Sequence, residues 1–342
     1  MTKVYSLSAE YEALIEPLLK AQGYSLKKPK PLADAIVALS DRYHQKHQLE
    51  NLWQEPSHRA AYLAYFMPLN SLRAQSLIEE GQRHSFWEGL SQWLDFGSGL
   101  GAMDWAFQNS SVLPFHETYF VEKGLQAQDL HQKLLPRRKE NRCWLTQPTK
   151  LKSIDSTLIT FSYSLNELGH LPDWALQAEA LCIVEPSTKE DGRKLLSIRQ
   201  QLIDSGFSIW APCVHQMACP LLTQSHRDWC HHRVAIELPE SLQQIEKHLP
   251  MKNRTLTYSY LLARKTSAPA FSSNTIRVIG DTLKEKGKTR QLICRGDQRE
   301  FFAWLHKLGD PQFLPHGSLV ELLDPIELKG QEIRLHSPVK VL

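Results

Sequence analysis

The sequence lacks any long apolar run. No stretch of eighteen apolar residues occurs among its 342 residues, although a membrane-spanning helix needs about that many. The first residues, Met1 to Tyr5, also lack the basic-then-apolar layout of a secretory signal. The formal net charge is only +3, so any RNA contact must come from local basic patches. We therefore expect a cytoplasmic protein without membrane contact.

Cysteine is scarce as well, with six residues in the chain. In a reducing compartment such residues are thiols or metal ligands more often than disulfides. Three of them, Cys213, Cys219 and Cys230, fall in one stretch that also holds four histidines. Thiolates gather in this way where a soft metal ion or an iron–sulfur cluster holds a segment that has no core of its own. We predict a metal or cluster site here.

The spacing of these cysteines leaves the metal open. They are separated by five and ten residues, which does not match the short C-x-x-C of common zinc modules and disfavours zinc without excluding it. A fourth thiolate would complete the set, and Cys294 is the only cysteine later in the chain. We expect Cys143 and Cys182 to act as small hydrophobic residues, because both stand in apolar surroundings. The alternative to a metal site is a polar loop with reduced thiols.

One glycine-rich stretch, WLDFGSGLGA over residues 93–102, has the pattern of a strand that turns tightly into a helix. The backbone N–H groups at the start of such a helix face a nucleotide ligand. A second predicted strand, 118–122, ends in Glu122, about twenty residues downstream, where a dinucleotide fold places its ribose-binding acid. We predict a nucleotide-type cofactor site at this loop, with a purely structural glycine turn as the alternative.

Strands and helices alternate after this loop, which is typical of a parallel sheet with crossover helices, so we predict an α/β fold. We expect a helical region over residues 1–90, with a break at Pro68. An α/β domain follows over 91–265, with a cysteine-rich insertion at 211–235, and a small β-rich module over 270–342.

The C-terminal module holds a basic hairpin-like turn over residues 284–290. Such a turn can place several cations against RNA phosphates. Phe301, Phe302 and Trp304 follow it. These aromatic residues can stack on bases or form a core, and we assign them to the core.

With these motifs the chain resembles the methyltransferase-like proteins of the small ribosomal subunit. Mitochondrial members of that family act in assembly of the subunit, and the family has bacterial relatives. The resemblance runs over most of the chain and is carried by residues 61–68, 94–101, 164–168, 184–186 and 211–231. The cysteine set is its specific part, because the glycine loop is shared by all class I methyltransferases.

The resemblance implies a class I methyltransferase (Rossmann-like) domain that binds S-adenosylmethionine and a 4Fe-4S cluster. The positions that match the cluster ligands are Cys213, Cys219, Cys230 and Cys294. The positions implied for S-adenosylmethionine are Asp95, Gly97, Ser98, Gly99, Gly101, Glu122 and Ser164. The resemblance also implies association with the small ribosomal subunit and its rRNA. We expect a monomer when the protein is free.

The acceptor side of the site leaves catalysis open. Adenine N-methylation commonly uses an Asn/Asp-Pro-Pro-aromatic run after the fourth strand, and residues 164–167 read Ser-Leu-Asn-Glu instead. A cytosine-C5 enzyme needs a thiolate there, and no cysteine is present. Asn166 and Glu167 are candidates for orienting an acceptor.

Two functions follow from these observations. One is a ribosome-assembly factor that binds rRNA through a methyltransferase fold, and the other is an active rRNA methyltransferase. A zinc-binding methyltransferase-like protein is a third alternative.

Overall fold

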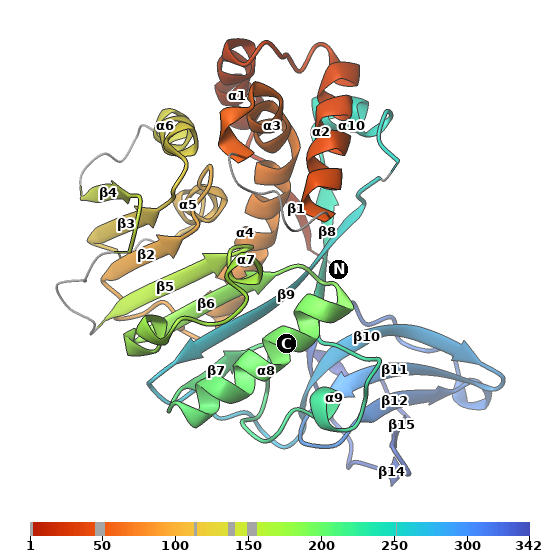
Figure 1. The fold of residues 1–342 in the computed structure, drawn as a ribbon. Helices are drawn as coiled ribbons and strands as arrows, with labels where there is room; N and C mark the ends of the chain where they lie inside the picture. Colours follow the sequence, from red (N-terminus) through yellow and green to blue (C-terminus); the bar gives the residue numbers. More distant parts are fainter. Residues whose placement is uncertain (1–2, 45–51, 113–114, 136–140, 149–155, 251) are drawn as a thin grey trace. The chain divides into compact units, whose positions relative to one another are not determined.

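The computed structural model describes residues 3–44, 52–112, 115–135, 141–148, 156–250 and 252–342. The chain divides into two compact units, the first of Met1–Gly169 with Val234–Leu256 and the second of His170–Arg233 with Thr257–Leu342. Figure 1 shows the elements of both. No helix in the described ranges is both long enough and apolar enough to cross a membrane.

Helices begin the first unit, as the sequence predicts. They are α1 (Glu10–Ala21), α2 (Pro29–His44), the short η1 (Leu52–Gln54), α3 (Pro56–Ala61), η2 (Tyr62–Phe66) and α4 (Met67–Arg83). In α1 the buried positions Tyr11, Ile15 and Leu19 are spaced by four residues, which places them on one face of the helix. The helical prediction misses one element, the strand β1 (Val4–Ser6), which pairs in parallel with β8 (His232–Glu237). The pairing partner is more than 200 residues away in sequence, so local periodicity carries no signal for it.

The predicted helix break at Pro68 is wrong. The π-helical η2 runs directly into α4, and Pro68 occupies the first turn of α4. The helix is continuous through Pro68, and the change from π-helical to α-helical hydrogen bonding directly before it accommodates a residue that has no N–H to donate.

A parallel sheet forms the centre of the first unit. Its strands β2 (Gln92–Phe96), β3 (Glu117–Val121), β4 (Arg142–Leu145) and β5 (Thr157–Ser162) pair in the order β5-β2-β3-β4. Two helices follow strands of this sheet, α5 (Ala102–Gln108) after β2 and α6 (Leu125–Leu134) after β3. The carboxyl ends of parallel strands meet at one edge, where this class of sheet binds its ligands. The α/β prediction is confirmed. The remaining helices of this unit are α7 (Leu165–Leu168) and α10 (Glu240–Glu246).

The second unit contains an antiparallel group of strands covered by a long helix. Both β6 (Ala180–Glu185) and β7 (Ser208–Ala211) pair antiparallel with β9 (Thr255–Arg264). Helix α8 (Lys189–Asp204) connects β6 to β7, and the Thr188 hydroxyl caps it by accepting the Asp191 N–H. The short elements η3 (Asp173–Gln177) and α9 (Pro220–Thr223) complete this part.

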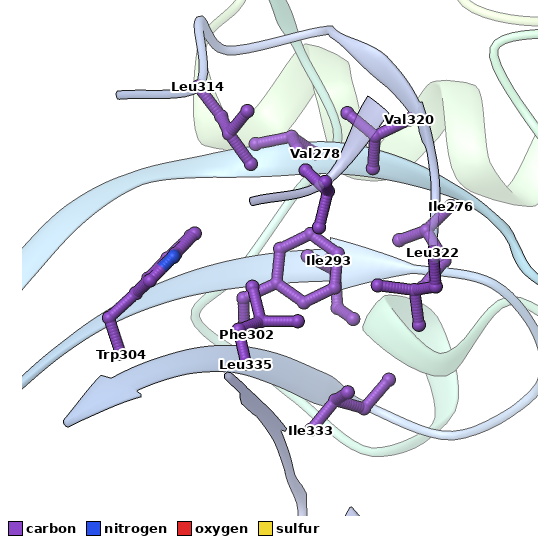
Figure 2. Close-up of a cluster of buried hydrophobic side chains, with 11 residues drawn as sticks. Ile276, Val278, Ile293, Phe302, Trp304, Leu314, Val320, Leu322, Ile333 and Leu335 are labelled. Atoms are coloured by element: carbon purple, nitrogen blue, oxygen red, sulfur yellow. The ribbon is translucent and has the colours of Figure 1, made fainter. Parts of the chain in front are cut away.

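A second sheet lies in the same unit, in the order β14-β15-β12-β11-β10-β13-β16. Its strands are β10 (Thr275–Glu285), β11 (Lys288–Cys294), β12 (Glu300–Leu305), β13 (Leu319–Glu321), β14 (Leu328–Lys329), β15 (Glu332–Leu335) and β16 (Lys340–Val341), and η4 (His306–Leu308) follows β12. Figure 2 shows its core, in which Val278, Ile293 and Phe302 point toward one another. Phe301 and Trp304 are also buried, so the assignment of these aromatic residues to a core is confirmed.

Candidate cofactor loop and thiol cavity

The glycine loop between β2 and α5 has the backbone that the sequence predicts. Gly97, Gly99 and Gly101 all have positive φ, at 70°, 52° and 80°. A Cβ on Gly97 would lie 2.5 Å from the Cβ of Ser164, and one on Gly101 would lie 2.2 Å from His131 Nε2. The loop therefore needs glycine both for its conformation and for its close contacts.

Asp95 lies inside the sheet beneath this loop, with 1% of its surface exposed. Its carboxylate accepts a hydrogen bond from the Thr160 hydroxyl, which in turn accepts one from the Trp93 indole N–H at 2.9 Å. Burial raises the pKa of Asp95 to about 7, although the bond from Thr160 acts in the opposite direction. Asp95 therefore links β2 to β5 just before the loop begins.

Glu122 follows β3 and reaches the glycine loop. Its carboxylate accepts the Gly99 N–H at 3.0 Å and the Gly124 N–H at 2.8 Å. Burial raises its pKa, while these backbone bonds and one from Trp53 favour the charged form. The structure thus brings the two predicted cofactor motifs, the loop and the downstream acid, into direct contact.

The two predicted serines have different environments. Ser164 donates to the Phe96 carbonyl at 2.7 Å, which ties the end of β5 to the end of β2. The Ser98 hydroxyl is buried and has no hydrogen-bond partner within the described ranges. A buried polar group without a partner is uncommon, so Ser98 Oγ is available to a ligand at the loop.

Two residues at this site have no signal in the sequence. Trp53, in η1, packs against the loop, and its Cδ1 would lie 2.2 Å from a Cβ on Gly124. Trp53 also hydrogen-bonds Glu122. Tyr62 lies beside it, with ring centroids 5.0 Å apart and near-perpendicular planes. Only the packing of the helical region on the sheet places these rings near the loop.

The candidate acceptor residues Asn166 and Glu167 lie on α7 and are exposed. The surrounding protein partly desolvates the Glu167 carboxylate, and this desolvation together with the charge of Glu122 raises its pKa to about 7. Tyr163, immediately before Ser164, has a φ of 60°, which is uncommon outside glycine. The chain therefore turns sharply between β5 and the exposed α7.

The four predicted metal-ligand cysteines line one cavity of the second unit. Cys213 follows β7, Cys219 precedes α9, Cys230 precedes β8 and Cys294 ends β11. Cys219 and Cys294 are each only 8% exposed. The rest of the lining is mostly apolar and is contributed by α8, β9 and β10, including Leu195, Leu196, Tyr260, Leu261 and Ile279. Thiols that are distant in sequence thus share one buried space.

The sulfur positions do not match a site for a single ion. Within the described part of the chain no group of three or more His, Cys, Asp or Glu residues is arranged to hold a metal ion. Tetrahedral zinc needs sulfurs about 3.8 Å apart, because each Zn–S bond is about 2.3 Å long. A 4Fe-4S cluster is larger, and its four thiolates bind different irons. The metal site therefore stays a prediction. Its support is the set of donor atoms, because four thiols that line one cavity are chemically suited to bind a cluster.

Arg199 of α8, which is fully buried, brings a positive charge to this cavity; the buried Arg277 also acts on Cys230. Its Nε donates to Cys213 Sγ at 3.1 Å, and its Nη2 donates to the carbonyls of His215 and Met217, both at 2.9 Å. Burial alone would lower the pKa of Arg199, but the cysteines raise it overall, Cys213 most of all. Arg199 stays charged in an apolar surrounding.

The thiols themselves are hard to ionise without a ligand. Burial, and then the charge of neighbouring cysteines, raises the pKa of Cys219, Cys230 and Cys294. His215 Nε2 lies 3.3 Å from Cys294 Sγ. Burial lowers the pKa of His215 to about 4, with the charge of Arg199 acting in the same direction. His215 is therefore neutral at pH 7.

The two remaining cysteines differ from each other. Cys182 is fully buried in β6, as expected of a small hydrophobic residue. The same expectation for Cys143 is wrong, because Cys143 is exposed. It lies on β4, the last strand in the sheet order of its unit, and every residue of β4 is half-buried or exposed.

The sequence does contain a signal for Arg199 that a search for metal ligands misses. Arg199 follows Leu195 by four residues and precedes Leu202 by three, so it lies on the apolar stripe of α8. A charged residue on a buried helix face needs a partner. That pattern predicts a buried counter-charge, although not its identity.

The basic turn is a hairpin, as predicted, formed by β10 and β11 with Lys286 and Gly287 at its tip. Two of its cations are held by carboxylates: Lys288 contacts Glu332 at 2.6 Å, and Arg290 contacts Glu285 and Glu332. Lys284 and Lys286 are exposed and have no ion pair among the residues that the structure describes. The cations available to an external phosphate are therefore fewer than the sequence indicates.

The chain was compared with solved structures, curated proteins and protein families. One similar solved structure is PH1948 of Pyrococcus horikoshii, named as a candidate RNA methyltransferase, with 15% identity over 68% of this chain and 97% of that chain and a TM-score of 0.34. A second is the magnesium protoporphyrin IX methyltransferase ChlM of Synechocystis PCC 6803 with bound S-adenosylhomocysteine, with 13% identity over 58% of this chain and 84% of that chain and a TM-score of 0.31. A third is the plantazolicin methyltransferase BamL, with 12% identity over 69% of this chain and 98% of that chain and a TM-score of 0.33. A search of curated proteins finds no match.

The family described as mitochondrial small ribosomal subunit Rsm22 matches residues 56–304, which include the glycine loop and all four cavity cysteines. The resemblance drawn from the sequence motifs is thereby confirmed. This match spans well over half of the chain, so the protein belongs to the Rsm22 family.

Proposed function

We propose that this protein is a methyltransferase-like factor that binds S-adenosylmethionine and a 4Fe-4S cluster, contacts small-subunit rRNA, and supports assembly or translation by the small ribosomal subunit in the cytoplasm. The observation that carries the proposal is the cavity at which Cys213, Cys219, Cys230 and Cys294 meet. Generic methyltransferase folds do not need such a set. The family membership supports the connection to the small subunit.

The glycine loop supports the S-adenosylmethionine part. Glu122 would hold the ribose hydroxyls, the N–H groups of the loop and the unpartnered Ser98 hydroxyl would bind the rest of the cofactor, and Asp95 would support the loop. Bound S-adenosylmethionine supplies an activated methyl group. Glu122 already accepts two backbone N–H bonds, so its carboxylate is held in place before any ligand arrives.

The thiol cavity supports the cluster part. Cys213, Cys219 and Cys230 come from one excursion of the chain, and Cys294 ends a strand of the second sheet. A cluster bound by all four would join these segments covalently and stabilise the second unit. Zinc is the alternative, and metal analysis distinguishes the two.

For rRNA, the exposed Lys284 and Lys286 of the hairpin support a phosphate contact. We propose that the protein is a monomer when free. Asn166 and Glu167 lie on the exposed α7 and would face a methyl acceptor if the protein is an active enzyme.

Two measurements test the proposal. Anaerobically purified protein should contain iron and acid-labile sulfide with a brown chromophore, and a zinc-only preparation would contradict the cluster. Small-subunit rRNA methylation should then be compared between cells that lack the protein and cells that carry Asp95→Ala. A site-specific mark lost in both identifies an active rRNA methyltransferase, whereas an unchanged map with impaired subunit assembly in the deletion supports the assembly factor.

A further inference from the structure

Arg199 poses a physical problem that the fold alone does not solve. Its guanidinium is fully buried, and no carboxylate pairs with it among the described residues. Its partners are Cys213 Sγ and two backbone carbonyls, and its Nη1 atom is buried without any hydrogen bond. Burying a charge without an opposite charge is strongly unfavourable. The cavity must therefore hold an anion when the protein is in its working state.

Among the described residues, the candidate anions that contact or surround Arg199 are the cavity thiolates. Metal ligands bind as thiolates rather than thiols, so a centre held by four cysteines concentrates negative charge in the cavity. Cys213 Sγ lies at hydrogen-bond distance from Nε, in the position of a charge-assisted donor to a ligating sulfur.

We propose that Arg199 is the counter-cation of the thiolate-bound cluster, a positioning residue that donates from Nε to the ligating sulfur of Cys213 and raises the reduction potential of the centre. The inference rests on the proposed function. A positive charge beside the cluster favours its more negative, reduced form, and hydrogen bonds to ligating sulfurs act in the same direction. The carbonyl bonds of Nη2 to His215 and Met217 hold the guanidinium in place and fix the segment between Cys213 and Cys219.

The same helix supplies a matched control. Arg193 is also on α8, and its Nη1 donates to the backbone carbonyls of Leu221, Ser225 and Asp228 at 2.8–3.0 Å. It holds the segment between Cys219 and Cys230 much as Arg199 holds the preceding one, but no hydrogen bond joins it to a sulfur among the described residues. Arg193→Gln thus removes a loop tie alone, whereas Arg199→Gln removes a loop tie together with the charge at the sulfur.

The test compares the midpoint potential of the cluster and the rate of iron release to a chelator in anaerobically purified full-length variants. We expect Arg199→Gln to shift the potential to more negative values and to speed iron release, and Arg199→Lys to lie between it and the wild type. Arg193→Gln should leave the potential unchanged. Equal potentials in Arg199→Gln and Arg193→Gln would overturn the role of Arg199 while the cluster itself stands.

A measurement on the wild-type protein covers the case in which Arg199→Gln does not fold. Protein labelled with ¹⁵N-arginine is reduced with dithionite and studied by pulsed electron paramagnetic resonance. An N–H donor on a ligating sulfur should give a ¹⁵N coupling to the cluster, and the absence of any coupling overturns the proposal. Wild-type protein without iron and sulfide is a different outcome, because it refutes the proposed cluster and the role of Arg199 together.

Discussion

The glycine loop and the thiol cavity are built in opposite ways. The loop is one contiguous stretch, and its main side-chain partner, Glu122, is satisfied by backbone N–H groups of Gly99 and Gly124. The cavity collects thiols from four places along the chain, and its buried cation, Arg199, has no carboxylate partner in the described ranges. The Glu122 carboxylate of the first site is satisfied within the protein, whereas the proposed cluster would balance the charge of Arg199 at the second.

The two sites should depend on a bound group to different degrees. Removing a cofactor from a site held by backbone bonds leaves those bonds intact. Removing the proposed anionic cluster from the cavity would leave a buried guanidinium beside thiols whose pKa values are raised by burial. We therefore expect the second unit to depend on its ligand far more than the first.

The largest effect is expected for Cys294→Ser. This change removes the proposed cluster ligand at the end of β11. Binding free energy at a structural metal site becomes folding free energy, about 10 kcal/mol or more in small zinc peptides. We expect this variant to lose iron and sulfide and its second unit to become more sensitive to proteases. Cys143→Ser is the control, because Cys143 is exposed and outside the cavity. Full iron content in Cys294→Ser would show that Cys294 is not needed to hold a cluster and would contradict the proposed dependence of the second unit on it.

The next effect concerns Asp95 and pH. Because its pKa is about 7 in the folded chain against an ordinary value of 3.8, the folded state binds more protons between these values, so this group lowers stability as pH rises from about 4 to about 7. The full pKa shift corresponds to a decrease in the free energy of unfolding on the order of 4 kcal/mol between low and high pH. Asp95→Asn keeps an acceptor for Thr160 and should be more stable than wild type at pH 8, with little difference at pH 4.

Urea unfolding at several pH values measures this change. Asp129→Asn, at an exposed carboxylate of α6 that pairs with Lys133, should leave the pH profile unchanged. A parallel profile for Asp95→Asn and wild type would show that Asp95 is ionised in the folded protein without cost.

Gly101→Ala should lower the free energy of unfolding by about 3 kcal/mol. A Cβ there meets the buried His131 ring at 2.2 Å, and φ is 80°; a left-handed residue costs about 1–2 kcal/mol and overpacking another 1–3. Gly89→Ala separates the two terms, because Gly89 has a φ of 73° but nothing within 4 Å of its added Cβ. Equal decreases in the thermal unfolding temperature of both variants would mean that the His131 side chain moves aside and that the loop is less rigid than proposed.

The smallest effect is expected at the hairpin. Lys286→Ala should weaken binding to a small-subunit rRNA fragment and reduce the salt dependence of binding by about one phosphate contact. Lys288→Ala is the matched control, since the Lys288 ammonium is already held by Glu332 and Glu285. Equal losses of rRNA affinity in the two variants would contradict a specific role for the unpaired cations. Unchanged affinity in both would show that this hairpin does not contact the RNA.

The local sequence pattern was sufficient to predict the elements that are formed by residues close together in sequence. The turn after β2, the strands around 157–162 and 180–185, and the basic hairpin follow from glycine placement and short-range periodicity. The errors have non-local or geometric causes. Strand β1 depends on pairing with β8, the helix passes Pro68 through a π-helical stretch, and the exposure of Cys143 depends on how β4 is covered.

By itself, the sequence determined the backbone of the cofactor loop, since residues 93–102 contain both the glycines and the helix start that shape it. It also named the four cysteines. Only the tertiary structure decided that those thiols share one cavity and that Arg199 is buried beside Cys213. The physical reason is that a tight turn is set by the φ preferences of adjacent residues, whereas a buried charge and its partners meet only after distant strands and helices have packed.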